Sequence, residues 1–156
     1  MNVLILGGTG FLGSHVTDAI VARGHNVRLF DKSVIERGDV EFINADFSDI
    51  MALSEALIGI DVVIHMISTS LRFISNHNCT SDINGNLVNT VNLLDLMRQA
   101  DVSNLVYFSS GGTVYGNPNY SPMDESHKTN PICSYGIVKL AIEKYICMYH
   151  SLYGIK

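Results

Sequence analysis

The chain is poor in cysteine, in clustered basic residues and in long apolar runs, and each shortage excludes a class of protein. Cys79, Cys133 and Cys147 lie far apart without a Cys-x-x-Cys pair, so we expect reduced thiols in a cytoplasmic protein and no metal site. The net charge is −5 and no Lys/Arg cluster occurs, which argues against binding to nucleic acid. No apolar run approaches a membrane span, and Met1-Asn2 leads directly into an apolar segment, so neither a membrane helix nor a secretory signal is expected.

Proline is also scarce, and its three copies all lie between 111 and 133, which we expect to be one long loop. The composition, with 47% hydrophobic and 16% charged residues, is typical of a compact protein rather than a disordered one. A chain of 156 residues can bury a sizeable core, so we expect 1–156 to form a single domain.

Short apolar segments alternate with longer segments whose apolar residues have helical spacing. We expect strands at 3–6, 26–30, 40–43, 61–65 and 104–109. We expect helices at 11–23, 48–57, 83–100 and 134–152, with Gly24 ending the first and Ser134 capping the last, and a polar, irregular stretch at 69–82. This alternation predicts an α/β fold, a doubly wound, Rossmann-like parallel sheet with strand order 3-2-1-4-5.

A sheet of this kind usually has further strands beyond the fifth. The chain ends at Lys156, directly after the last expected helix, and offers no segment that could close over a substrate. We therefore expect it to be the N-terminal part of a longer protein.

Glycines between the first expected strand and helix have the spacing of a dinucleotide-binding turn, either Gly7-x-x-Gly10-x-x-Gly13 or Gly8-x-Gly10-x-x-Gly13. The first permits a tight turn, Gly10 lets a pyrophosphate approach the backbone, and Gly13 lets the helix pack closely on the sheet. The phosphates would then meet the unpaired N–H groups at the helix start, where Phe11 and Leu12 lie. A plain glycine turn is the alternative.

Acidic residues follow the next two expected strands. Asp31 lies 18 residues after Gly13, where a carboxylate would accept hydrogen bonds from the adenosine ribose and repel a 2′-phosphate. This position favours NAD over NADP. Asp46 and Phe47 follow the third strand and could hold and cover the adenine, although a helix-capping Asp with a core Phe is the alternative.

Tyr135 and Lys139 are spaced i, i+4 on the last expected helix, so their side chains share one face. A free phenol is a poor base at neutral pH, but a neighbouring ammonium stabilises the phenolate. Tyr135 could therefore take a hydroxyl proton while hydride leaves the same carbon for NAD, with Lys139 also bonding the nicotinamide ribose. The alternative is an ordinary pair on an amphipathic helix.

From Asp82 onward the sequence resembles the extended short-chain dehydrogenase/reductase family, in its NAD-dependent epimerase/dehydratase branch, and in particular UDP-glucose 4-epimerase-like members. The resemblance extends over essentially the whole chain. Its motifs are the glycine turn, Asp31, Asp46-Phe47, Asp-Val-Val-Ile-His at 61–65, Asn-Leu-Val-Asn-Thr-Val-Asn-Leu-Leu at 86–94, Phe-Ser-Ser-Gly-Gly-Thr-Val-Tyr-Gly at 108–116 and Tyr-Gly-Ile-Val-Lys at 135–139.

The resemblance implies a UDP-sugar substrate, tightly held NAD and a C-terminal substrate domain that this chain lacks. It implies that Asn86 supports the cofactor and that the backbone at Met66 and Ile67 passes close to the nicotinamide. It also implies a homodimer through helices 86–100 and 135–150, and apolar residues on several faces of both helices favour such a partner.

One position departs from the family. A Ser or Thr usually stands where this chain has Gly111, and either Ser110 or Thr113 could supply that hydroxyl to the substrate. Sugar dehydratases also need an acid and a base in this loop, where the chain has Gly112 and Thr113, so dehydration is disfavoured.

Two classes of function remain. The Tyr135/Lys139 pair favours an NAD-dependent nucleotide-sugar epimerase, or its cofactor-binding part. Gly111 and the short chain favour a non-catalytic NAD-binding or interaction module of the same fold. Another sugar oxidoreductase or dehydratase of the family is a further alternative.

Overall fold

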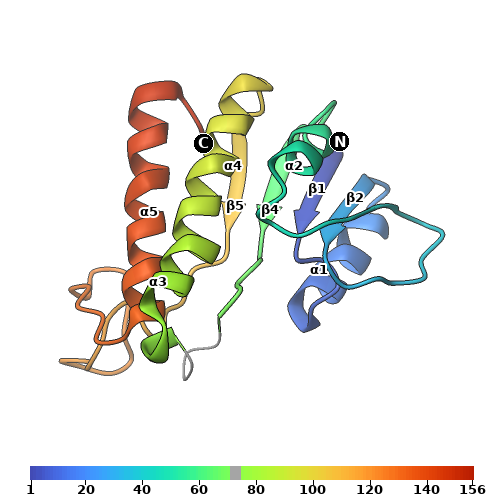
Figure 1. Cartoon of the computed structure of the whole chain (residues 1–156). Helices are drawn as coiled ribbons and strands as arrows, with labels where there is room; N and C mark the ends of the chain where they lie inside the picture. Colours follow the sequence, from blue (N-terminus) through green and yellow to red (C-terminus); the bar gives the residue numbers. More distant parts are fainter. Residues whose placement is uncertain (71–74) are drawn as a thin grey trace.

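The computed structural model describes residues 1–70 and 75–156, so part of the irregular stretch expected at 69–82 lies outside the described residues. Within these ranges five parallel strands form one sheet in the order β3-β2-β1-β4-β5, which confirms the predicted topology (Figure 1). The strands are β1 (Asn2–Leu6), β2 (Asn26–Asp31), β3 (Glu41–Asn44), β4 (Val62–His65) and β5 (Asn104–Tyr107).

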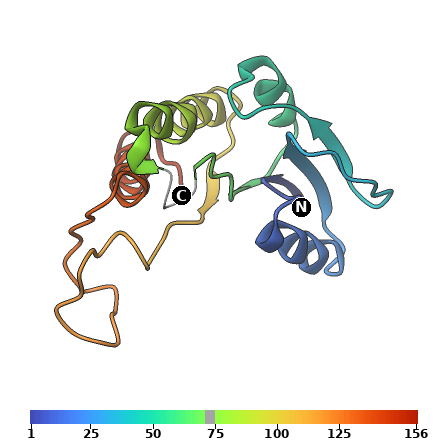
Figure 2. The ribbon, with the colours of Figure 1, turned by 60° about the horizontal axis from the view of Figure 1, so that its bottom comes forward.

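Helices cover both faces of the sheet. They are α1 (Phe11–Val21), α2 (Ile50–Ala56), η1 (Ser75–His77), α3 (Cys79–Asp82), the π-helix η2 (Ile83–Val88), α4 (Asn89–Gln99) and α5 (Ser134–Tyr153). Figure 2 shows α1 on one side of the strands and the bundle of α4 and α5 on the other. No helix within the described residues is long and apolar enough to span a membrane.

The central strand β1 is buried on both faces, as a strand inside a parallel sheet must be. Val3 and Ile5 belong to the core beneath α1, whereas Leu4 and Leu6 pack in the larger core with α2 and α4. Successive strand residues point to opposite faces, so one short apolar run anchors both layers.

The helix expected at 83–100 is present as the π-helix η2 followed by α4. The helical series begins earlier than expected, because α3 directly precedes η2 in the stretch expected to be irregular. Gly85 lies in the π-helical part, where a Cβ would come within 2.4 Å of the Thr69 hydroxyl. The widened turn thus brings the start of this series against the segment after β4. Such π-turns are frequent at functional sites.

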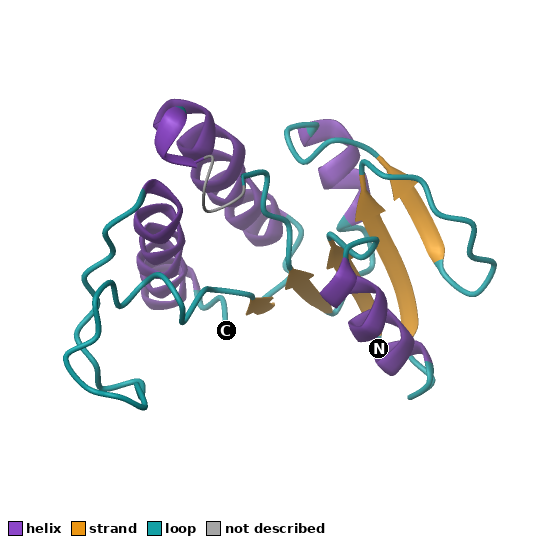
Figure 3. Cartoon of the chain, turned by 90° about the horizontal axis from the view of Figure 1, so that it is seen from below, coloured by secondary structure: helices purple, strands orange, loops and turns teal. Residues whose placement is uncertain are grey.

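The expected cap at Ser134 is wrong. The N-cap of α5 is Cys133, which makes no cap hydrogen bond with its side chain, and Ser134 is already the first helical residue. The Ser134 hydroxyl donates to Asp82 Oδ2 at 2.6 Å instead. The long loop before α5 projects away from the sheet (Figure 3).

The β1–α1 turn gives a first prediction. A Cβ at position 13 would lie 2.1 Å from the Gly7 carbonyl oxygen, so Gly13→Ala must displace the turn. We expect the free energy of unfolding, measured with urea, to fall by roughly 2 kcal/mol. Gly10→Ala is the matched control, because Gly10 has φ −71° and its Cβ would meet only the Gly7 oxygen, at 3.5 Å. Wild-type stability in Gly13→Ala would contradict the close packing.

Candidate functional site

The candidate site lies at the carboxyl edge of the sheet, where the strand order reverses between β1 and β4 and ligands of such sheets bind. A pocket of about 260 Å³ opens here. It is lined by Gly7, Thr9, Gly10, Asp31, Lys32, Ser33, Ala45, Asp46, Phe47, Met66, Ile67, Ser68 and Thr69. The pocket therefore brings together residues from the ends of four strands.

The glycine turn forms one wall of this pocket. Gly7 has φ +87°, and a Cβ there would lie 3.0 Å from the Ile67 nitrogen, so the turn needs glycine both for its conformation and for its contact with the segment after β4. Gly10 is different, because it is exposed and no described atom other than the Gly7 oxygen lies within 4 Å of its Cβ position. The fold itself does not require glycine at position 10, which leaves space for a ligand.

The N-terminus of α1 adjoins this space. No described side chain caps the helix, and its first turn contains no acidic residue. Phe11 and Leu12 are 80% and 56% exposed. The free N–H groups and the helix dipole at such an end favour an anion, as a pyrophosphate group would be.

Asp31 is fixed at the opposite side of the pocket by the glycine turn itself. Its Oδ2 accepts hydrogen bonds from the Thr9 hydroxyl at 2.7 Å and the Thr9 N–H at 3.2 Å. Its Oδ1 accepts one from the Ser33 N–H at 3.2 Å. Sequence reasoning missed Thr9, whose only signal was a hydroxyl at a variable position of the glycine motif.

Asp46 and Phe47 both line the pocket. Of the alternatives considered for them, only the core position of Phe47 is found, because the N-cap of α2 is Asp49 rather than Asp46. Asp46 accepts hydrogen bonds from the N–H and the hydroxyl of Ser48, which lower the pKa of Asp46. Phe47 is buried in the core, with its ring centroid 5.0 Å from that of His65.

Lys139 of α5 is buried near the end of β5, with 5% of its surface exposed. Its Nζ donates a hydrogen bond to the Phe108 carbonyl at 2.9 Å and lies 4.7 Å from the Tyr107 ring centroid and 5.7 Å from that of Tyr135. Burial lowers the pKa of Lys139 to about 8. The ammonium therefore keeps its charge at pH 7 beside the half-buried Tyr135.

The two candidate hydroxyls differ in their surroundings. Thr113 is buried, and its hydroxyl lies 3.4 Å from the Ser110 carbonyl oxygen. Ser110 is half-buried, and its hydroxyl has no hydrogen-bond partner within residues 1–70 and 75–156. Gly111 and Gly112 are exposed. Ser110 is thus the freer of the two hydroxyls.

Asn86 is fully engaged within the protein. Its Oδ1 accepts a hydrogen bond from the Thr69 N–H at 2.8 Å, and its Nδ2 donates to Asp82 Oδ1 at 2.9 Å. These bonds hold the segment after β4, which begins with Met66 and Ile67 and lines the pocket. Asn86 therefore shapes the pocket wall from behind.

His65 is a buried core residue. Its Nε2 lies 3.0 Å from the Thr90 hydroxyl, which itself donates to the Asn86 carbonyl, so Nε2 is the protonated nitrogen of a neutral ring. Burial, with a smaller effect from Lys139, lowers the pKa of His65 to about 3. The ring stays uncharged at neutral pH.

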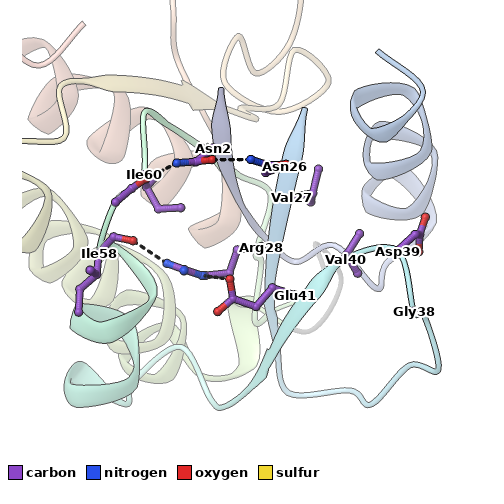
Figure 4. A pocket seen from close by; sticks show the side chains of 11 residues that line it. Asn2, Asn26, Val27, Arg28, Gly38, Asp39, Val40, Glu41, Ile58 and Ile60 are labelled. Atoms are coloured by element: carbon purple, nitrogen blue, oxygen red, sulfur yellow. Dashed lines mark hydrogen bonds and ion pairs between the residues drawn. The ribbon is translucent and has the colours of Figure 1, made fainter. Parts of the chain in front are cut away.

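A larger cavity of about 580 Å³ lies at the opposite, amino edge of the sheet (Figure 4). Its charged groups are already paired with each other and with the backbone. Arg28 Nη1 donates to the carbonyls of Ala56 and Ile58, and its Nε lies 2.8 Å from Glu41.

Among the residues that the structure describes, no group of acidic, His and Cys side chains could hold a metal ion.

The parallel sheet, its glycine turn and the crevice at its switch point define a Rossmann-like fold of the dinucleotide-binding type. More particularly, the chain belongs to the NAD-dependent epimerase/dehydratase family, whose model matches residues 3–156. This confirms the family expected from the motifs.

Curated relatives are UDP-glucose 4-epimerases. The chain is 38% identical to a putative UDP-glucose 4-epimerase of Methanocaldococcus jannaschii over 99% of this chain and 52% of the relative. It is 34% identical to the UDP-glucose 4-epimerase of Corynebacterium glutamicum over 99% of this chain and 48% of the relative. The chain thus spans about half the length of these relatives.

Solved structures of UDP-glucose 4-epimerases are also similar to this chain. The UDP-glucose 4-epimerase of Thermotoga maritima with UDP-glucose has a TM-score of 0.92 and 28% identity, covering 100% of this chain and 53% of that one. The Thermus thermophilus enzyme in complex with NAD has a TM-score of 0.91 and 31% identity, with the same coverage.

Proposed function

We propose that residues 1–156 are the NAD-binding domain of a nucleotide-sugar epimerase that resembles UDP-hexose 4-epimerases. The observation that carries this proposal is the buried Lys139 beside Tyr135. It is hydrogen-bonded to the residue after β5, at the same carboxyl edge of the sheet as the pocket. The relatives' names support a UDP-sugar as the substrate. Because the chain spans about half of each relative, we propose that a separate C-terminal domain holds the sugar nucleotide.

The described residues fit NAD. The uncapped start of α1 and the open space at Gly10 suit the pyrophosphate, and Asp31 suits the adenosine ribose. The residues that would hold the cofactor are Gly7, Gly10, Phe11, Leu12, Gly13, Asp31, Asp46, Phe47, Met66, Ile67, Asn86, Tyr135 and Lys139. When bound, NAD supplies the acceptor for a hydride from a sugar carbon.

The protein's own part in the reaction is proton transfer and positioning. Tyr135 removes the proton from the sugar hydroxyl, and the ammonium of Lys139 stabilises the phenolate and bonds the nicotinamide ribose. Of the two candidate hydroxyls, Ser110 rather than Thr113 orients the substrate oxygen, because Thr113 is buried. Positions 112 and 113 offer no carboxylate, which favours epimerisation over dehydration.

A second candidate function is a non-catalytic NAD-binding module. The specific observation in its favour is Gly111, an exposed glycine where the family hydroxyl is expected. The two candidates share cofactor binding and differ in Tyr135-dependent turnover.

We also propose that the protein is a cytoplasmic homodimer. Its cysteines are free, with Cys79 and Cys147 exposed, as suits a reducing compartment. Apolar residues of α5 form an exposed stripe at helical spacing, namely Ile137, Tyr145, Met148 and Leu152. Exposed Ile83 and Val88 in the preceding helical series extend the apolar surface that a second copy would cover.

The dimer predicts twice the chain mass in light scattering at micromolar concentration. Met148→Glu places a charge in the apolar stripe and should shift the mass toward one chain. Lys144→Glu, on an exposed polar position of the same helix, is the control and should leave the mass unchanged. A wild-type mass of one chain would contradict the proposal.

Asp31 predicts a preference for NAD over NADP. In calorimetric titration we expect NAD to bind at least about tenfold more tightly than NADP, because the carboxylate repels the 2′-phosphate. Asp31→Asn keeps an oxygen that can accept from Thr9 but removes the charge, so it should reduce this preference. Gly10→Ala should fold normally and yet lose about tenfold in NAD affinity, because its methyl group occupies the phosphate space. Equal binding of both cofactors by the wild type would refute the role of Asp31.

We predict that efficient epimerisation of UDP-sugars requires residues beyond the 156 of this chain. We expect the 156 residues to bind NAD but to epimerise UDP-sugars poorly, because a displacement of about an ångström in the sugar can cost roughly a hundredfold. The comparison is between this chain and the chain with any coding sequence that follows Lys156, each with and without Tyr135→Phe. In the active form, Tyr135→Phe should lower kcat by about a hundredfold or more. Unchanged kcat in that variant would overturn the role of Tyr135, whereas NAD binding without measurable turnover in either form would support the non-catalytic module.

A further inference from the structure

Asp82 is a buried carboxylate that the proposed chemistry does not use. It is 2% exposed and accepts hydrogen bonds from the hydroxyls of Ser70, at 2.5 Å, and Ser134, at 2.6 Å, and from Asn86 Nδ2, at 2.9 Å. Within the described ranges no ion pair includes it. A buried charge is costly, so three donors converging on it indicate a specific role.

The three donors come from two different sides of the site. Ser70 and Asn86 belong to the wall behind the cofactor pocket, because Asn86 also binds the Thr69 N–H. Ser134 is the first residue of α5 and directly precedes Tyr135. Asp82 therefore connects the cofactor wall to the helix that carries the Tyr135/Lys139 pair.

The start of α5 depends on this wall for its caps. The Ser134 N–H donates to Asn76 Oδ1 at 2.8 Å, and the Tyr135 N–H donates to the Ser75 hydroxyl at 3.2 Å. Both acceptors lie in the segment just before α3, which ends at Asp82. A helix capped by another segment can keep its first turn in place only while that segment stays attached.

Asp82 also contributes charge to the surroundings of Lys139. The titratable groups that face Lys139 are Asp82 from α3, Glu143 and Tyr135 from α5, Tyr107 from β5 and His65 from β4. Burial lowers the pKa of Lys139, while the carboxylates of Asp82 and Glu143 act in the opposite direction. Burial also raises the pKa of Tyr107 and lowers that of His65, so both stay neutral.

Of the two carboxylates that act on Lys139, only Asp82 is nearly fully buried. Glu143 is partly exposed and accepts a hydrogen bond from the Ser109 hydroxyl. Solvent screens an exposed charge more strongly than a buried one. Asp82 is thus the principal fixed negative charge near the ammonium.

We propose that Asp82 is a positioning residue, whose carboxylate holds the first turn of α5 through Ser134 and supplies the buried negative charge that keeps Lys139 a cation beside Tyr135. This inference rests on the proposed function of the Tyr135/Lys139 pair. Asp82 touches neither reacting atoms nor cofactor and acts through these two residues.

The effect of the Asp82 charge on Lys139 is tested by NMR titration of the chain labelled with ¹³C-lysine. Lys139→Met assigns the Lys139 resonance. Lysine is charged below its pKa, so losing an anion moves the midpoint to lower pH. Asp82→Asn, which preserves shape, should lower the Lys139 midpoint by about one pH unit. Glu143→Gln removes the exposed carboxylate and should lower it by less than about half of that. An unchanged midpoint in folded Asp82→Asn would overturn the proposal.

The role of the Ser134–Asp82 hydrogen bond in holding the first turn of α5 is tested by hydrogen exchange of the Tyr135 amide. Ser134→Ala keeps the charge of Asp82 and should accelerate this exchange by about tenfold, whereas Ser134→Thr keeps the hydroxyl and should not. If Asp82→Asn does not fold, Ser134→Ala alone decides, and wild-type exchange in it overturns this role. Neither measurement involves cofactor, so a wild-type chain that fails to bind NAD would refute the proposed function without affecting these results.

Discussion

The close approach between the β1–α1 turn and its neighbours is the constraint on which the site depends. Gly13 brings the start of α1 against the Gly7 carbonyl, and Gly7 lies against the backbone of Ile67 beyond β4. The same turn holds Asp31 through Thr9. Three strand ends are therefore fixed by one turn, and the pocket between them follows from that packing rather than from any long-range ion pair.

The second organising feature is the buried ammonium of Lys139. Taking a lysine out of water is costly unless donors and charges around it are satisfied. The Phe108 carbonyl, the faces of two tyrosine rings and the carboxylate of Asp82 offset that cost. Because Phe108 directly follows β5, the Lys139 side chain joins the end of the sheet to α5.

Much of the fold could be predicted because its signals are local. The glycine turn and the Tyr135/Lys139 spacing depend on residues close in sequence. The strand order is predicted from the alternation of short apolar segments with helical ones, and it agrees with the structure. The errors concern partner choice over long distances. Ser134 has the chemistry of an N-cap, yet its hydroxyl is directed to Asp82, 52 residues earlier. The π-helical turn at Gly85 likewise depends on contact with Thr69, which no periodicity reveals.

The polar groups of the site divide into those already held by the protein and those left open. Asp31, Asn86 and Lys139 are each fixed by hydrogen bonds within the protein, so the cofactor binding that we propose at these positions would cost little ordering. The start of α1 and the Ser110 hydroxyl remain open. The proposed cofactor site thus consists mostly of prearranged groups. The loop after β5, where we propose that the sugar binds, offers within the described residues the unengaged Ser110 hydroxyl and two exposed glycines at 111 and 112. Such a surface can orient one oxygen of a substrate, but the remaining contacts needed for near-attack geometry must come from elsewhere. This division supports the proposal that the 156 residues bind the cofactor and contribute little to substrate selection.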